Sequence, residues 1–351
     1  MKAFQIARRV ALSSAFLGVL LVLAGVLSRP ALADTCTSNG TDGGDWSQST
    51  TWQAGCPVGG PGTNDDVLIL NGDTVVIDGT GSNAAKNVTI EAGGELVANA
   101  NTLSVSGDWA NSGEFIHGSG TVLLNGGTTQ MVSGDTIFYN LTISVSGTNV
   151  SFGTSSTTIA NQFSKTGGSM NANTGSFHFI GTAGTIVGSG SKDFYVLEVV
   201  QGASISHSGG SLTIRGSFTN NGTFTQESSL STFFSQSASI LLSGSGSTTF
   251  GKVTVQGGTT LNAGSHDHTV TGNTWQVSTN GTFNGDTATV IFHGATSIAG
   301  AGNHRFNNVV IGPGNTLSNL DTSRPISIKG DWTNNGTYTA GTETVTLNGS
   351  A

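Results

Sequence analysis

The stretch LSVSGDWANSGEFIHGSGTVLL, residues 103–124, decides the fold because its pattern returns about every 55 residues. Three sets of apolar residues carry this repeat. They are Leu124, Phe179, Phe234, Phe292 and Leu347; Val105, Ile159, Ile214, Val270 and Ile328; and Ile143, Val199, Val255 and Ile311. So regular a period indicates stacked structural units in place of a globular fold.

Within each repeat, apolar and polar residues alternate in short segments such as Leu103-Ser104-Val105. Alternation at period two is the pattern of strands with one buried face, and clusters such as Asn220-Asn221-Gly222 are turn signals. The apolar anchors follow one another at an average of about 19 residues. We therefore predict an all-β parallel β-helix (β-solenoid) with about 19 residues per coil and three coils per 55-residue repeat.

Residues 1–33 have the features of a signal peptide, with a basic start, an apolar stretch and the small residues Ala31 and Ala33 before the expected cleavage site. An uncleaved membrane anchor is the alternative. Cleavage would remove four of the 12 basic residues and leave all 20 acidic ones, for a net charge of −12. So acidic a chain is a poor partner for nucleic acid, and we expect no membrane contact after cleavage.

Residues 34–102 precede the regular repeats and contain both cysteines, Cys36 and Cys56. In an oxidising compartment the simplest pairing is one disulfide, with a two-cysteine metal site as the alternative. We expect this segment to form an N-terminal cap and the first coils. Residues 103–351 then form the β-helix repeats, of which the last is incomplete.

An aromatic residue opens each repeat, at Trp109, Phe163, Phe218, Trp275 and Trp332. Rings at equivalent places can stack along a rod and brace it. We favour this packing role because the position exchanges Trp and Phe. A row of sugar-binding platforms is the alternative.

Residues suited to chemistry are few. His266 and His268 are weak candidates for a metal site, since His268 stands where other repeats have an inward apolar residue. The acidic residues are scattered, whereas glycoside hydrolysis needs two carboxyl groups within about 5–10 Å of each other. We therefore expect no cofactor, no metal, no catalytic residues and no enzymatic activity.

The segment from Gly44-Asp45-Trp46-Ser47 to Ser106-Gly107-Asp108-Trp109 resembles the start of bacterial secreted β-helix proteins with a G8-like domain. The phrase around Gly330-Asp331-Trp332 resembles repeats of large bacterial surface and adhesin-like proteins. This resemblance implies a right-handed β-helix, a bacterial origin and a location outside the cell. It implies no catalytic residues.

The sequence thus predicts a secreted, non-enzymatic structural protein of the cell exterior. The fifth repeat stops partway, so head-to-tail self-assembly into filaments or a matrix is one expectation, and a truncated reading frame is its alternative. An adhesin or glycan-binding module is the second function that we consider, and a polysaccharide-active enzyme is the third.

Overall fold

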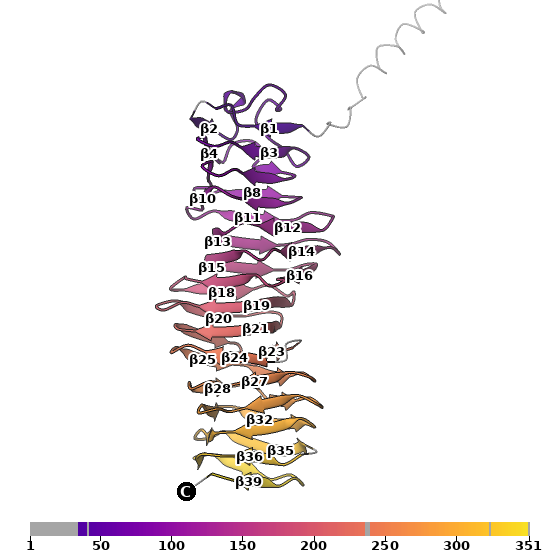
Figure 1. The fold of residues 1–351 in the computed structure, drawn as a ribbon, viewed down its shortest axis with the longest axis vertical. Coiled ribbons are helices and arrows are strands. Elements are labelled where there is room, and N and C mark those ends of the chain that lie inside the picture. The colour runs from indigo at the N-terminus through magenta and orange to yellow at the C-terminus, as the bar shows by residue number, and fades with distance from the viewer. Residues whose placement is uncertain (1–33, 41, 236–238, 323, 350–351) are drawn as a thin grey trace, which may run out of the picture.

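The computed structural model describes residues 34–40, 42–235, 239–322 and 324–349, and the predicted signal peptide lies outside them. These residues form a rod of stacked coils with the N-terminal strands at one end and the C-terminal strands at the other (Figure 1). The fold is an all-β parallel solenoid of about 13 turns. Within the described ranges, helix is limited to the 3-10 turn η1 (Ser49–Thr51), and no helix has the length and hydropathy to cross a membrane.

Each coil between the first and the last contributes one strand to each of three parallel sheets, which we number in the order in which the chain enters them. The first sheet contains β1 (Thr35–Thr37), β3 (Asp66–Ile69), β6 (Val88–Ile90), β9 (Trp109–Asn111), β12 (Gln130–Ser133), β14 (Asn149–Phe152), β16 (Ser169–Asn171), β23 (Ser231–Phe234), β26 (Lys252–Val255), β29 (Thr274–Val277), β32 (Ala295–Gly300), β35 (Thr316–Thr322) and β38 (Thr337–Thr339). The second contains β2 (Gly43–Asp45), β4 (Thr74–Val76), β7 (Glu95–Val97), β10 (Glu114–Ile116), β17 (Ser176–Phe179), β24 (Ser239–Ser243), β27 (Thr260–Asn262), β30 (Thr282–Asn284), β33 (Asn303–Phe306), β36 (Ile326–Ile328) and β39 (Val345–Leu347).

The third sheet contains β5 (Ala84–Ala85), β8 (Thr102–Val105), β11 (Thr121–Leu124), β18 (Gly184–Val187), β20 (Ser204–His207), β22 (Thr223–Gln226), β25 (Ser247–Phe250), β28 (His268–Val270), β31 (Thr289–Phe292), β34 (Asn308–Ile311) and β37 (Trp332–Asn334). Four long strands turn a corner and serve two sheets. They are β13 (Thr136–Ile143) and β15 (Ser156–Lys165), which join the second to the third sheet, and β19 (Lys192–Val199) and β21 (Leu212–Asn220), which join the first to the second.

The predicted alternation places one face of each strand inside the rod. In β11 and β17, for example, buried residues alternate with half-buried ones. The apolar anchors of the repeat are buried, except for Leu347 in the last described strand, which is 67% exposed. Strands that bury every second side chain against two other sheets leave no space for helices, and this accounts for the all-β fold.

Strand pairing corrects the predicted relation between repeat and coil. Leu124 and Phe292 are three repeats apart in sequence, and they lie in the third sheet eight coils from one another. The coil therefore has about 21 residues, close to the predicted 19. One 55-residue repeat then spans eight strands, or two and two-thirds coils, where we had predicted three. Successive copies of one anchor, such as Leu124, Phe179 and Phe234, lie in the third, second and first sheets in turn.

The N-terminal coils are closed by the predicted disulfide between Cys36 and Cys56. Trp46 and Trp52 pack edge to face beside it, and both indole N–H groups donate to backbone carbonyls, those of Ser82 and Trp46. Both indole rings are buried at this end of the described rod.

Candidate functional site

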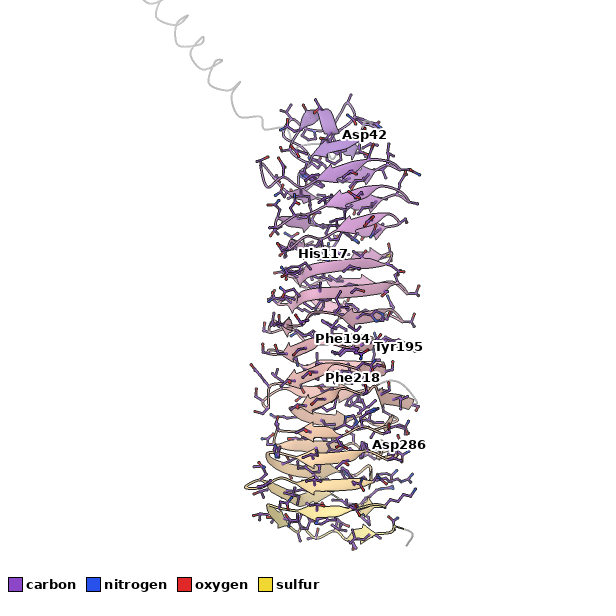
Figure 2. All side chains as sticks on the ribbon, turned by 90° about the vertical axis from the view of Figure 1, so that its left-hand side faces the viewer. Asp42, His117, Phe194, Tyr195, Phe218 and Asp286 are labelled. Carbon is purple, nitrogen blue, oxygen red and sulfur yellow. A yellow bond between two sulfur atoms is a disulfide. The ribbon has the colours of Figure 1, made fainter. Side chains whose placement is uncertain are left out.

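The aromatic residues that open the repeats point into the rod. At most 2% of each side chain is exposed for the first four, and the fifth is half-buried: Trp109, Phe163, Phe218, Trp275 and Trp332. Each contacts rings of its own repeat, so that Trp109 lies 5.0 Å from Phe115 and 5.4 Å from Phe138 between ring centroids. Phe218, marked in Figure 2, heads the corresponding cluster of the third repeat. The first four rings belong to internal clusters and are not sugar-binding platforms, whereas the half-buried Trp332 packs edge to face on Tyr338.

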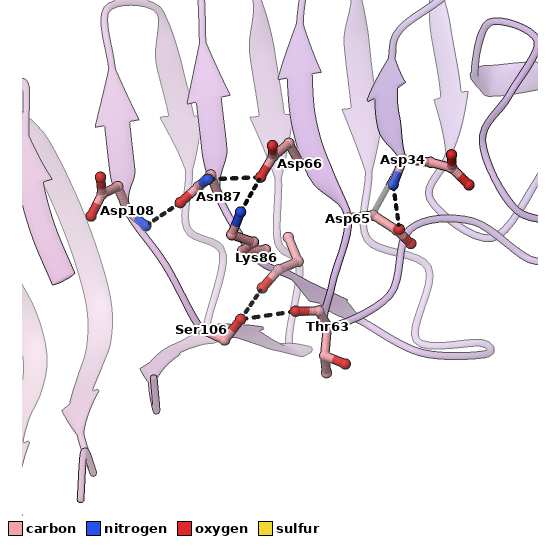
Figure 3. Close-up of polar contacts among 9 residues, drawn as sticks. Asp34, Thr63, Asp65, Asp66, Lys86, Asn87, Ser106 and Asp108 are labelled. Atoms are coloured by element: carbon pink, nitrogen blue, oxygen red, sulfur yellow. Dashed lines mark hydrogen bonds and ion pairs between the residues drawn. The ribbon is translucent and has the colours of Figure 1, made fainter. Parts of the chain in front are cut away.

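Acidic residues near the N-terminal end accept hydrogen bonds from backbone N–H groups of turns. Asp65 accepts the backbone N–H groups of Asp34 and Gly62 at 3.1 and 2.8 Å. A ladder of side chains follows along the rod, in which Asn87 donates to Asp66 at 2.7 Å and accepts the N–H of Asp108 at 2.6 Å (Figure 3). Such contacts fix the entry of each coil into the first sheet.

A buried polar pair recurs at one corner of the first and third repeats, two residues after the first aromatic and two residues before the third. We call it the corner pair. In the first repeat Asn111 donates to Thr136 at 3.1 Å, and in the third repeat Asn220 donates to Thr248 at 2.8 Å. The amide oxygen of Asn220 also accepts the N–H of Gly222. The corner pair is thus neutral, and its hydrogen bonds satisfy buried polar groups of a turn inside the rod.

The second repeat replaces this neutral pair with two lysines, Lys165 and Lys192. Only 2% and 0% of their side chains are exposed. The ammonium group of Lys165 donates to the carbonyl of Gly168 at 2.6 Å, and that of Lys192 donates to the carbonyls of Gly188 and Gly209. Burial lowers the pKa of both groups, and for Lys192 the nearby charge of Lys165 adds to the effect and brings its pKa to about 8.

The backbone around the lysines leaves room for their ammonium groups. A Cβ atom on Gly190 would lie 2.7 Å from Nζ of Lys165, and one on Gly210 would lie 3.0 Å from Nζ of Lys192. A cavity of about 470 Å³ borders both lysines at the same corner. Its other walls are two Gly- and Ser-rich turns, residues 166–170 and 189–191, with Asp193 and Thr213.

The buried polar groups continue into the next coil. Nε2 of His207 lies 3.2 Å from the carbonyl of Gly209, and Nδ1 lies 3.0 Å from the amide of Gln226. Donation from Nε2 to the carbonyl leaves Nδ1 as the acceptor, so the ring is neutral. Burial, with a contribution from Lys192, lowers the pKa of His207 to about 3. The corner therefore contains two amines and no acidic group inside the rod among the described residues that hydrogen-bond to them.

The outer face of the same repeat carries two pairs of polar side chains. Nδ1 of His178 lies 2.7 Å from Glu198, and Nε2 lies 2.9 Å from the hydroxyl of Ser176. This order matches the nucleophile, base and acid of acyl-transfer sites. However, β17 pairs along its length with β15 and β19, so its backbone N–H groups cannot stabilise an oxyanion. We interpret the three residues, which we call the outer ladder, as a contact between neighbouring coils.

Arg215 forms the second outer pair, with its Nε 2.7 Å from Asp193. Its Nη2 also donates to Asn171 at 2.9 Å. Asp193 borders the lysine cavity, and Arg215 neutralises its carboxylate. The two buried amines therefore have no negative partner there among the described residues.

The weak metal candidates do not form a ligand set. His268 is buried as expected, with Nε2 donating to the carbonyl of Ala263 at 2.8 Å. His266 lies with Asp267 at a separate cavity of about 470 Å³. Across the described part of the chain, no group of three or more His, Cys, Asp or Glu residues is placed to hold a metal ion.

Neither Lys165 nor Lys192 is among the site residues singled out from the sequence. The signal that could have found them is the spacing of the repeat itself. At the two corner positions, the first and third repeats have Asn and Thr and the second has Lys and Lys. A charged residue at an internal position of a repeat is informative because buried charges are rare unless they are paired.

The sequence profile of the G8 domain matches residues 51–226, half of the chain. The chain therefore belongs to the G8 domain family. No curated protein and no solved structure matches the chain with significance. The matched residues begin at the end of η1 and include β3 to β22 and the lysine corner.

Proposed function

We propose that this member of the G8 domain family is a secreted structural protein of the cell exterior, in which the solenoid acts as a rigid spacer. The observation that supports this most directly is the continuous buried core, which extends from Cys36 to Ile328. Each coil packs on the next through this core, so the rod resists bending between coils. A spacer needs such stiffness and needs no cleft.

Secretion is supported by the leader-like residues 1–33 and by the Cys36–Cys56 disulfide, since disulfides persist in oxidising compartments. The resemblance of the repeats to bacterial surface proteins supports a bacterial cell surface. Cell fractionation with an antibody against the rod tests this address. We expect the protein outside intact cells, and an intracellular pool that keeps residues 1–33 would contradict it.

Electron microscopy of the mature protein, residues 34–351, tests the spacer role. About 13 coils at a strand spacing of about 4.8 Å predict straight particles of roughly 60 Å. Limited proteolysis should leave the repeats as one resistant fragment. Bent particles, or cleavage into separately folded pieces, would contradict a single rigid rod.

Self-assembly and glycan binding remain separate proposals. Negative-stain images at increasing protein concentration test head-to-tail filaments, and uniform single rods at the highest concentration would reject them. Glycan binding loses the support of Trp109 and Trp275, which are inside the rod, whereas Trp332 is half-buried. It now depends on Trp332 and on the Ser-, Thr- and Asn-rich outer surface.

A further inference from the structure

We propose that the lysine corner of the second repeat binds an oxyanion, a carboxylate, sulfate or phosphate group, in the cavity beside Lys165 and Lys192. This goes beyond the spacer role and does not depend on it. The first observation is the comparison within the molecule. The same corner is built from Asn111 and Thr136 in the first repeat, so folding does not require lysines there.

The second observation is the unbalanced charge at the corner. Two ammonium groups are desolvated in one place, and their hydrogen-bond acceptors are neutral carbonyls of Gly168, Gly188 and Gly209. Carbonyl dipoles satisfy donors but do not neutralise charge. A bound anion in the cavity would supply the negative charge that these dipoles lack, and its attraction to the buried amines would be screened little by solvent.

The third observation is the fit of the cavity. Its volume of about 470 Å³ admits a small anion or a single sugar acid, and its walls carry hydroxyl groups from Ser169, Ser189 and Ser191. Nζ of Lys165 lies directly against Gly190, since a Cβ atom there would be 2.7 Å from it. The titratable groups that face the corner are the two lysines, the neutral His207, Asp193 and Arg215, and Asp193 is paired with Arg215. The net local charge therefore favours an anion.

Thermal unfolding of the mature protein tests the proposal with sodium phosphate, sodium sulfate and sodium galacturonate, each against sodium chloride at equal ionic strength. A ligand that binds the folded state raises the midpoint as its concentration passes the dissociation constant. We expect a saturable rise of a few degrees with at least one of the three. The three probes distinguish an inorganic anion from a sugar carboxylate.

The control is the double variant Lys165→Asn/Lys192→Thr, which installs the corner pair that the first and third repeats already use. Phosphate and sulfate stabilise many proteins by exclusion from their surface, and this variant retains that effect. It should lose the saturable rise. An equal rise in both proteins, or no rise in the wild type beyond that with chloride, would overturn the proposal.

A second variant keeps the test decisive if the double variant does not fold. Gly190→Ala keeps both lysines and places a methyl group against Nζ of Lys165. We expect the apparent affinity for the same anion to fall at least about tenfold, because the methyl group moves the ammonium group of Lys165 away from its place beside the cavity. Unchanged affinity in a folded Gly190→Ala protein would overturn the placement of the site.

Discussion

The corners of the first and second repeats occupy equivalent positions of the 55-residue repeat, yet they are chemically opposite. Asn111 and Thr136 form a neutral hydrogen bond, whereas Lys165 and Lys192 place two amines in the interior. The strands, the aromatic cluster and the turn around them are shared. The difference shows that the repeat determines the shape of the rod, while single departures from the repeat determine its chemistry.

The largest effect on stability should come from placing the two lysines at the corner of the first repeat. We expect Asn111→Lys/Thr136→Lys to lower the free energy of unfolding by about 3–5 kcal/mol, because two charges lose their hydration without partners. Urea unfolding measures the loss. Ser119→Lys/Thr128→Lys adds the same charge at exposed positions and should change stability little. A first repeat that tolerates the lysines would show that the corner is indifferent to charge.

The alkaline pH dependence of stability should come from the second repeat. The pKa of Lys192 is about 8 in the folded protein and 10.5 when unperturbed. Between these values the unfolded chain binds more protons, so stability rises with pH across this window, by about 3 kcal/mol for one fully shifted group. Urea unfolding from pH 8 to pH 10.5 measures the slope, and Lys165→Asn/Lys192→Thr should flatten it. An identical slope in both proteins would contradict this.

The fourth repeat provides a third version of the corner, with Val277 and His304 in the two positions. Burial lowers the pKa of His304 to about 4, and its Nδ1 has no partner among the described residues. Between pH 6.5 and pH 4 the unfolded chain binds the extra proton, so stability falls on acidification, by about 2 kcal/mol from pH 7 to pH 5. Val277→Asn/His304→Thr should reduce that loss, as measured by urea unfolding at both pH values. His207 and His268 remain, so part of the acid sensitivity stays.

The outer ladder should contribute least, because its charged residues are partly exposed. Glu198→Gln should lower stability by at most about 1 kcal/mol, the range of cross-strand pairs. Urea unfolding of Glu198→Gln beside Ser176→Ala measures both contacts. A loss well beyond that range would mean that the outer ladder, and not the core alone, holds these coils together.

Sequence patterns predicted the strands well because inward positions repeat strictly. Val105, Leu124 and Ile143 are buried in successive coils of the third sheet, as their even spacing suggested. The number of coils per repeat was predicted wrongly for a physical reason. The step from Ile143 to Ile159 leads to the second sheet, and an inward apolar residue has the same appearance in all three sheets.

The lysine corner was harder to predict because its two lysines are more than one coil apart in sequence and belong to no known motif. Lys165 alone resembles an ordinary solvated lysine at a Gly-rich turn. Its burial follows only from its place two residues after Phe163, where the neighbouring repeats have an internal Asn. The outer ladder could have been predicted, since His178 and Glu198 are one coil apart in sequence.

The mismatch between repeat and coil has a geometric consequence. Each 55-residue unit adds two and two-thirds coils, so gaining or losing one unit would turn everything beyond it by about a third of a revolution. A given surface residue type returns to the same side of the rod only after three units, roughly 38 Å further along. A flat partner lying against one side would therefore meet every third copy, and neighbouring copies would face two other directions.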